Sequence, residues 1–577
     1  MIAVRSVVAM SAVLVVACTG PQVPGDANAP RDAPRLDVPP SDAPRPDAAL
    51  DCVERVRPAF RLIAPLSTSL ATSRRPTFRW AAPAGTTAHL EICTDRSCMT
   101  LIERITTTQT DALPSTDLPP GTVFWRVVTD AGEASATWQV RVGHHSAPND
   151  TSWGSVPDVN GDGLTDVIVT GANEALFTSH VFVYLAHASG FDAFPTATLN
   201  GASVGCATRA GDVNGDGYVD VVSGMSIYLG GPNGLSADRA VSLTWRAGTS
   251  EHQGYATSVG DLDRDGYADL VVVDWRNSTA SPGSDVLVYY GGPAGPSCAR
   301  DVLSSSIVNV DAPSVVAAND VNADGFADLI FVDPTSSRVD LHLGRADGIA
   351  LRGIPIAAVD PTATPFPRGV AALGDVNGDG LSDVAIGAGP INHPGRVYVL
   401  LGAPDGLAMA PFATLDASAL PPALVSRALY AMAIGDVDAD GFADVMLTSE
   451  VRDASGSLAS QGIVVLAGGP TALTPRASWS IDGDRAGYGI GVFGMGDTNG
   501  DAVDDVVIGD ASAPPVGVAR LYPGSPRGLA VAPVMTWTSP RADSWYGCIA
   551  QLGRPQIYGA VGPGRVHRPL GPWKQPA

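Results

Sequence analysis

The chain has 577 residues, of which 45% are hydrophobic and only 16% charged, and it contains 64 glycines and 47 prolines. Many turn-forming residues beside few charges favour short strands over long helices. The formal net charge of −23, with no basic stripe to offset it, argues against a nucleic-acid partner.

The first residues have the pattern of an export signal. Arg5 precedes an apolar run at residues 7–17, which is too short to cross a bilayer. The run ends in Val-Val-Ala-Cys, which resembles a bacterial lipobox with Val in place of Leu at its first position. The resemblance implies a lipoprotein signal peptide at residues 1–17 and lipid on Cys18. The alternative is an ordinary secretory signal cleaved nearby. We expect an exported bacterial lipoprotein whose partner is the membrane, on the outer membrane or cell surface or facing the periplasm.

The cysteine count agrees with export. If Cys18 carries lipid, six of the seven cysteines remain, an even number that suits disulfides. Cys93 and Cys98 bracket a short turn and predict a disulfide across a hairpin end. A zinc site would need a second Cys or His pair nearby, and the sequence has none there. The pairing of the other cysteines stays open: Cys52, Cys206, Cys298 and Cys548.

Two segments precede the repeats. Residues 18–50 are rich in Pro, Asp, Ala and Arg without hydrophobic periodicity, which predicts a disordered tether. Residues 51–146 contain alternating stretches at 75–80, 118–127 and 137–142, each after a turn signal, which predict a small β-sandwich. The Pro-x-Phe-x-Trp and Pro-Gly-x-x-Phe-Trp-Arg-Val stretches resemble a fibronectin type III-like domain. That resemblance implies a spacer or an interaction platform.

Residues 147–577 repeat a nine-residue pattern, Asp-x-Asp/Asn-x-Asp-Gly-x-x-Asp, seven times. A β-branched apolar run follows each copy, and further short strands precede the next. Four strands in a unit of about 50–60 residues predict the blade of a β-propeller. We therefore expect an all-β chain in which a small sandwich precedes a calcium-binding propeller of four-stranded blades.

The repeated pattern has the oxygen ligands that calcium prefers. Side chains at positions 1, 3, 5 and 9 and the carbonyl at position 7 can converge when glycine at position 6 permits a tight turn. A single copy could be an ordinary turn, but seven in register indicate a metal. A helix-loop-helix site is disfavoured because the closing acid stands at position 9 and a strand follows. Up to seven calcium ions would cancel about 14 negative charges. The expected ligands are Asp158, Asn160, Asp162, Leu164 and Asp166; Asp212, Asn214, Asp216, Tyr218 and Asp220; Asp261, Asp263, Asp265, Tyr267 and Asp269; Asp320, Asn322, Asp324, Phe326 and Asp328; Asp375, Asn377, Asp379, Leu381 and Asp383; Asp436, Asp438, Asp440, Phe442 and Asp444; Asp497, Asn499, Asp501, Val503 and Asp505.

The seventh copy departs from the pattern, because Ala502 replaces the glycine at position 6. Alanine resists a positive φ, so we expect a distorted or weaker site at this copy.

The repeat unit resembles the FG-GAP repeat of the integrin α-subunit propeller. The fifth copy carries the likeness best, with Gly374-Asp375 entering the loop, Gly-Ala-Gly-Pro at 387–390 after it and Gly-Arg-Val-Tyr at 395–398. The seventh has Tyr488-Gly489 where the family has Phe-Gly. The resemblance implies structural calcium at the propeller edge. No interval between copies is long enough for the ligand-binding domain that some integrins insert.

The number of blades is open. Residues 546–553 and 557–567 echo the strands of a blade without its loop. They form either a degenerate eighth blade or the closing part of a seven-bladed ring. The first unit looks complete, which favours eight; the resemblance favours seven.

The sequence has none of the zinc-protease, nucleophile-elbow or phosphate-loop motifs. Trp245, Trp479 and Trp537 recur on the fourth strand of their units, which predicts packing between blades. Trp275 is expected in a loop, as a candidate contact residue. We predict a non-catalytic binding or adhesion module for a protein or glycan. The alternatives are an extracellular polysaccharide-acting enzyme with a lyase-like propeller and a purely structural envelope protein.

Overall fold

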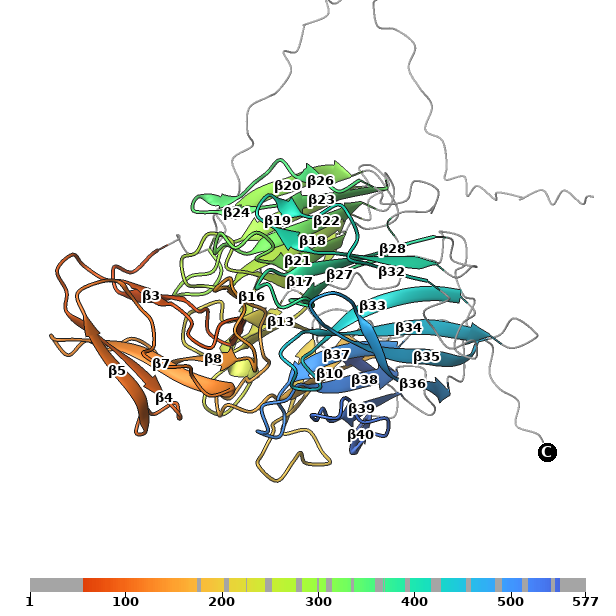
Figure 1. Cartoon of the computed structure of the whole chain (residues 1–577), viewed down its shortest axis with the longest axis horizontal. Helices are drawn as coiled ribbons and strands as arrows, with labels where there is room; N and C mark the ends of the chain where they lie inside the picture. Colours follow the sequence, from red (N-terminus) through yellow and green to blue (C-terminus); the bar gives the residue numbers. More distant parts are fainter. Residues whose placement is uncertain are drawn as a thin grey trace, which may run out of the picture. The chain divides into compact units, whose positions relative to one another are not determined.

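The computed structural model describes residues 56–549 apart from these gaps: 174–177, 202–206, 225, 244–251, 277–282, 298–299, 308–313, 334–336, 358–366, 368, 390–394, 417–426, 453–457, 483–489, 511–516 and 541–544. The chain divides into units 1–47 and 48–577, and all described residues lie in the second. Nearly all their regular structure is β-strand (Figure 1), beside one 3-10 turn, η1 (Ala237–Arg239). None of their helices has the length and apolar character needed to span a bilayer. The predictions for Cys18, Cys52, Cys206, Trp245, Cys298 and residues 550–577 fall outside the described residues.

The N-terminal domain consists of two sheets, drawn red to orange in Figure 1. Alternating apolar residues of both sheets meet in one core. The Phe78 ring lies 4.9 Å from Trp125 between centroids, and Trp125 lies 5.6 Å from Trp138. The smaller sheet has the order β1 (Arg61–Ala64), β3 (Phe78–Ala81), β6 (Asp111–Ala112), and the larger has β5 (Leu101–Thr107), β4 (Ala88–Cys93), β7 (Gly121–Thr129), β8 (Trp138–Val142), β2 (Ser69–Ala71), β9 (Ser152–Trp153).

The larger sheet continues beyond the predicted domain boundary at residue 146. After β8 the chain leaves the sheet and returns as β9, in which Trp153 pairs with Leu70 of β2. Residues 143–151, between these two strands, are called the strap below. The strap thus begins and ends in the sandwich.

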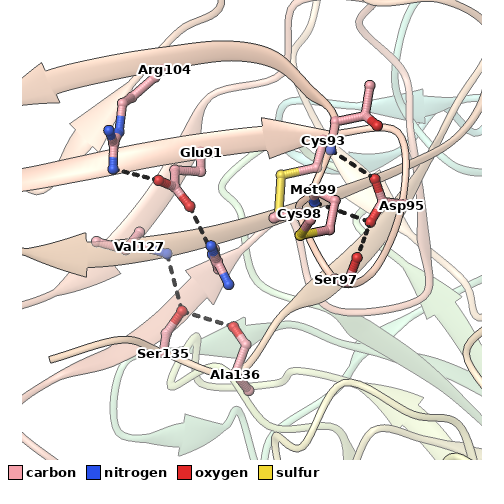
Figure 2. The surroundings of a disulfide bond; sticks show 12 residues. Glu91, Cys93, Asp95, Ser97, Cys98, Met99, Arg104, Val127, Ser135 and Ala136 are labelled. Carbon is pink, nitrogen blue, oxygen red and sulfur yellow. Dashed lines mark hydrogen bonds and ion pairs between the residues drawn. A yellow bond between two sulfur atoms is a disulfide. The ribbon is translucent and has the colours of Figure 1, made fainter. Parts of the chain in front are cut away.

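A disulfide joins Cys93 at the end of β4 to Cys98, with 5.1 Å between their Cα atoms. Figure 2 shows the tight turn that the bond closes. The Asp95 carboxylate holds this turn by accepting the N–H groups of Met99 at 3.2 Å and Thr100 at 2.9 Å. The predicted bridge is therefore present, and it fixes the turn that carries Arg96.

The repeat region forms seven four-stranded antiparallel sheets within the described residues, drawn yellow to blue in Figure 1. In the second to seventh sheets the inner strand is the one before the acidic loop, and in the first sheet it is β41; inner strands of successive sheets contact one another from the second sheet round to β41. From inner to outer strand the sheets are β41 (Trp545–Ile549), β10 (Val167–Asn173), β11 (Thr178–Tyr184), β12 (Ala197–Gly201); β13 (Thr208–Gly211), β14 (Asp220–Ser223), β15 (Ser226–Tyr228), β16 (Ala240–Ser242); β17 (His252–Gly260), β18 (Asp269–Arg276), β19 (Gly283–Tyr289), β20 (Arg300–Ile307); β21 (Ser314–Asn319), β22 (Asp328–Asp333), β23 (Arg338–His342), β26 (Ile354–Pro355); β27 (Gly369–Gly374), β28 (Asp383–Ala388), β29 (Arg396–Leu400), β32 (Ala413–Leu415); β33 (Arg427–Gly435), β34 (Asp444–Arg452), β35 (Leu458–Ala467), β36 (Thr474–Asp482); β37 (Ile490–Gly496), β38 (Asp505–Asp510), β39 (Val518–Tyr522), β40 (Met535–Thr538). Two small hairpins extend the third strands: β24 (Gly344–Arg345) with β25 (Gly348–Ile349), and β30 (Gly402–Ala403) with β31 (Gly406–Leu407).

The last described strand closes the ring. β41 supplies the inner strand of the first sheet, and Cys548 pairs with Thr170 of β10. This pairing agrees with the second of the two alternatives left by the sequence, and the number of blades stays a prediction. The C-terminal segment, as far as it is described, completes the first sheet, and the described residues contain no eighth four-stranded sheet.

Apolar clusters between neighbouring sheets form the propeller core. Trp537 packs in such a cluster between the seventh and first sheets, 5.2 Å from the Tyr184 ring. Trp479 packs against the cluster between the sixth and seventh sheets, 5.8 Å from Tyr522. Both tryptophans therefore have the predicted role. The prediction for Trp275 is wrong, because this residue lies in β18, paired with Gln253, and not in a loop.

Candidate metal centre

Six of the acidic loops join the first and second strands of their sheets, and the first loop leads from β9 into β10. All seven are linked to one another in a circle. In each loop the N–H of position 8 donates to the carbonyl of position 1 in the preceding loop. Thr165 of the first loop donates to Asp497 of the seventh at 2.9 Å, which closes the circle. Six of these N···O distances are 2.8–3.0 Å, and the bond from Val219 to Asp158 is 3.4 Å. The loops therefore share one edge of the ring.

The aspartate at position 1 organises its own loop. One carboxylate oxygen accepts the position-6 N–H at 2.7–3.0 Å in all seven loops. In the fifth loop the other oxygen of Asp375 accepts the N–H groups of Gly378 and Asp379, at 2.6 and 3.0 Å. Each loop thus wraps its backbone around its first carboxylate. This arrangement fixes the position of the first predicted ligand without help from distant residues.

The aspartate at position 9 does more than the sequence indicated. In every copy one of its oxygens accepts the position-2 N–H of the same loop at 2.8–3.1 Å. Its other oxygen accepts an N–H just after the third strand at 2.8–2.9 Å. The position-9 carboxylate therefore also bridges the loop and the end of the third strand through hydrogen bonds. A carboxylate oxygen has two lone pairs, so each can still face a cation.

The remaining side chains complete acidic clusters. Carboxylate oxygens of Asp261, Asp263 and Asp265 in the third loop lie within 4.8 Å of one another. So do oxygens of Asp436, Asp438 and Asp444 in the sixth. Hard oxygen ligands at this spacing suit a divalent cation such as calcium or magnesium. The residues present therefore fit a metal ion, with positions 1, 3 and 9 converging in the sixth loop.

The carboxylates of the loops are buried at an electrostatic cost. Burial, followed by the charge of Asp216, raises the pKa of Asp212 to about 8. Burial also raises the pKa of Asp261 to about 7 and that of Asp444 to about 8. A buried carboxylate without a compensating cation prefers its protonated form. A divalent ion in each loop would remove this penalty, which is the electrostatic reason to place one there.

The seventh loop keeps the common geometry despite its alanine. Ala502 adopts a φ of 67°, and its N–H donates to Asp497 at 2.7 Å as glycine does elsewhere. The expected distortion is therefore not seen in the backbone. Alanine instead occupies a left-handed conformation that glycine adopts at lower cost.

Replacing Ala502 by glycine is expected to raise the free energy of unfolding by about 0.5–1 kcal/mol, because glycine accepts the positive φ without strain. Denaturant unfolding in calcium buffer measures the change. The matched reverse substitution is Gly441→Ala at position 6 of the sixth loop, where φ is 91° and an added methyl would overlap His145. It should destabilise by more than Ala502→Gly stabilises. A neutral or destabilising Ala502→Gly would count against strain at this position.

Position 4 also adopts a left-handed backbone conformation, a requirement that the nine-residue pattern does not include. Glycine stands there in four loops, but Arg264, Ala323 and Ala439 adopt φ values of 56–61° at the same position. The only sequence signal for this conformation was the recurrence of glycine at position 4, and three of the seven loops lack that glycine.

The N-terminal domain sits on the first three loops. Arg96, in the disulfide-closed turn, donates to Gly161 of the first loop at 2.8 Å and to Gly217 of the second at 2.6 Å. Its guanidinium also lies 4.1 Å from the centroid of the Tyr218 ring. Trp138 donates through its indole N–H to Gly215 at 3.1 Å. The sandwich is therefore fastened to backbone carbonyls whose positions depend on the folded loops.

The strap continues this contact around the ring. Asn149 and Thr151 donate to the carbonyls of Asp379 and Gly380 in the fifth loop at 2.7 and 2.5 Å. The imidazole of His145 stacks on Phe442 of the sixth loop, with 5.6 Å between centroids. Arg141 donates to the Ala502 carbonyl of the seventh at 3.1 Å. Sandwich and strap together contact six of the seven loops. No local sequence signal predicted this.

Arg57 approaches the third loop where a cation would be expected. Its guanidinium lies 2.9 Å from an Asp263 oxygen and 3.2 Å from an Asp265 oxygen. The third loop carries an acid at each of positions 1, 3, 5 and 9. Arg57 therefore supplies part of the positive charge that this loop requires.

These features define a repeat β-propeller with acidic loops in a closed ring. The model of the FG-GAP-like repeat matches residues 158–223, 320–386 and 375–447, which include the first, second, fourth, fifth and sixth loops. The chain therefore contains FG-GAP-like repeats at these residues, as the resemblance implied, within an all-β structure of four-stranded sheets.

Integrin α chains are similar to part of the sequence. Integrin alpha-4 of Xenopus laevis is 32% identical over 144 residues, which is 23% of this chain and 13% of that protein. Integrin alpha-PS3 of Drosophila melanogaster is 32% identical over 140 residues, 22% of this chain and 12% of that protein. The chain thus spans only about an eighth of the length of these relatives.

Solved structures give weaker likenesses. A protein from Lactobacillus plantarum superposes with a TM-score of 0.33 and 11% identity, covering 68% of this chain and 96% of that one. The rhamnogalacturonan lyase YesW gives a TM-score of 0.22 and 12% identity, covering 80% and 66%. Scores this low say nothing about the activity of this chain.

Proposed function

We propose that this chain is a non-catalytic binding or adhesion module of the bacterial cell envelope, stiffened by up to seven calcium ions. The observation that carries the calcium part is the hydrogen-bonded geometry common to the seven loops, together with the buried carboxylates that converge in the third and sixth. Calcium is favoured over magnesium because its coordination shell tolerates six to eight oxygens in a flexible arrangement. FG-GAP-like repeats and the similarity to integrin α chains support the binding role.

The ligand in this proposal is a protein or a glycan that contacts the propeller away from the acidic loops. Sandwich and strap already contact six of those loops, so the loops serve the architecture more than recognition. Binding residues on repeat scaffolds commonly lie on loops that a rigid core positions.

A binding array of proteins and glycans, probed with residues 48–577 in calcium buffer, tests the binding role. We expect at least one saturable ligand whose binding survives a change in salt concentration. Depolymerisation of a polysaccharide on the same array would contradict the non-catalytic assignment. The absence of binding to any protein or glycan on a broad array would favour a purely structural role.

The envelope location in this proposal depends on lipid at Cys18, with residues 18–50 as the tether. Replacing Cys18 by alanine is expected to move the protein from the membrane fraction to the soluble fraction and to abolish labelling by a lipid precursor. Fractionation and metabolic labelling of the two forms measure this. A Cys18→Ala protein that stays in the membrane fraction would contradict the anchor.

Arg57 provides a specific test of the calcium assignment. The Arg57→Ala variant is expected to bind calcium more tightly at the third loop, about fivefold or more, because calcium must displace an ion pair with buried carboxylates and even an exposed pair is worth up to about 1 kcal/mol. Calorimetric calcium titration measures the affinity. Arg345→Ala is the matched control, since Arg345 pairs with the exposed Asp347 at 2.8 Å, outside the acidic loops. Equal titrations for both variants would show that Arg57 and calcium do not compete.

A further inference from the structure

A cavity of about 220 Å³ lies between the strap and the inner strands of the propeller. Its polar lining includes Arg141, His144 and Asp504, and its apolar lining includes Trp153 and Phe493. At about 30 Å³ for each water molecule, the volume corresponds to roughly seven waters. A small organic molecule fits this space, and a macromolecular segment does not.

Arg209 of β13 lines this cavity, and the carboxylate whose charge acts on it, that of Asp504, forms its ion pair with Arg141. Arg209 is only 8% exposed. Its guanidinium donates to the carbonyl of Ser155, beside the strap, and to that of Gly494 in β37 at 3.4 Å. Its Nε is buried and has no hydrogen-bond partner. Among the described residues no carboxylate forms an ion pair with it.

A buried guanidinium is costly unless an anion or a full set of acceptors faces it. Burial lowers the pKa of Arg209 to about 10, which leaves it charged at neutral pH. The two neutral carbonyls share its positive charge but do not cancel it. This position is therefore a strong candidate for an anion.

The other charges around the cavity do not supply that anion. Asp504 forms an ion pair with Arg141 and accepts the Asp436 N–H at 2.8 Å. The carboxylates of Asp375 and Asp436 also line the cavity, but each accepts N–H groups of its own loop. In the calcium-loaded protein proposed above, these two carboxylates would face the metal of their own loops, so neither is available to pair with Arg209.

We propose that this cavity binds a small monovalent organic carboxylate through Arg209. An anion is inferred from the buried guanidinium with its unpartnered Nε–H, a single charge from the one arginine that would bind it, and an organic body from the apolar lining, which would pack poorly against a fully hydrated inorganic ion. The carboxylate accepts the free Nε–H and a second guanidinium N–H, as planar carboxylates do. Propionate matches this description in charge and size.

Calorimetric titration of propionate into the calcium-loaded full chain tests the proposal. Saturable binding of propionate is expected, with no binding of uncharged propionamide. The Arg209→Met variant should weaken propionate binding at least tenfold, whereas Arg345→Met, on the exposed surface, should leave it unchanged. Absence of saturable propionate binding, or equal binding by Arg209→Met, would overturn the proposal. Equal or tighter binding of sulfate would overturn the assignment to an organic carboxylate.

Two further measurements keep the test decisive. Saturation transfer from protein protons to the propionate methyl group in the wild-type chain reports binding directly and does not depend on the folding of Arg209→Met. Its absence would also overturn the proposal. A separate calcium titration distinguishes failure here from failure of the calcium assignment. If calcium binds and propionate does not, only the carboxylate site is excluded.

Discussion

Removing calcium is expected to lower the melting temperature of the chain by on the order of 10–20 °C. Each site held at a hundredfold excess over its Kd adds about 2.7 kcal/mol to the folded state. Seven such sites, set against an unfolding entropy of about 2.1 cal/mol/K per residue, give a shift of this size. Differential scanning calorimetry with calcium and with chelator measures it.

The effect of chelation should grow with pH. In the metal-free chain, burial raises the folded-state pKa of Asp436 to about 7 and that of Asp212 to about 8, above the usual value near 3.8. The folded state then holds protons that the unfolded state releases, so metal-free stability falls as pH rises from about 4 to about 8. Calcium binds the deprotonated carboxylates, so its contribution rises over the same range. The calcium-dependent shift should therefore be larger at pH 8 than at pH 5.

Magnesium at the same concentration is the control, because it demands a tighter octahedral shell and should restore less of the lost stability. A melting temperature that is the same with and without chelator at pH 8 would contradict the proposal that the loops bind calcium. A shift of equal size at pH 5 and pH 8 would leave metal binding intact but contradict the role of the buried carboxylates.

The contacts of Arg96 extend this expectation to the N-terminal domain. Arg96 fastens the sandwich to carbonyls of Gly161 and Gly217, which are residues of the acidic loops themselves. A loop that loosens on chelation would move these acceptors. Calcium should therefore stabilise the contact between the sandwich and the acidic loops as well as the ring.

The sequence predicted what depends on local repetition. Seven copies of a nine-residue pattern identified the loops and the four-stranded units, and six of those loops are the turns between first and second strands, while the first leads from β9 into β10. The role of Trp537 was also predictable, because a large apolar residue that recurs at one blade position has few places to pack.

What the sequence could not predict depends on contacts between distant residues. The second acceptor bond of each position-9 aspartate comes from an N–H beyond the third strand, such as Ala186 for Asp166. Nothing in the nine-residue pattern marks that partner. The same holds for the closure by β41 and for the docking of Arg96, since both join segments far apart in the chain. The Trp275 prediction failed because its flanking polar residues resemble a turn, while ladder pairing extends β18 through them.

The position-9 aspartate leads to the second large expected effect. Asp166→Ala should lower the free energy of unfolding by about 2–5 kcal/mol even in chelator. The substitution leaves the N–H groups of Val159 and Ala186 buried without acceptors, at about 1–3 kcal/mol each. In calcium buffer the loss should be larger, because a ligand is removed as well.

Asp162→Ala in the same loop is the matched control. Asp162 is exposed, and its side chain accepts the Leu164 N–H at 2.9 Å near the surface, where water can replace it. Its substitution should cost little in chelator and show its effect in calcium only. Urea unfolding of both variants in the two buffers separates the roles. If both variants lose the same free energy of unfolding in chelator, the position-9 carboxylate acts as a metal ligand alone. If Asp166→Ala is destabilised in chelator and Asp162→Ala is not, the hydrogen-bonded bridge to the third strand is independent of metal.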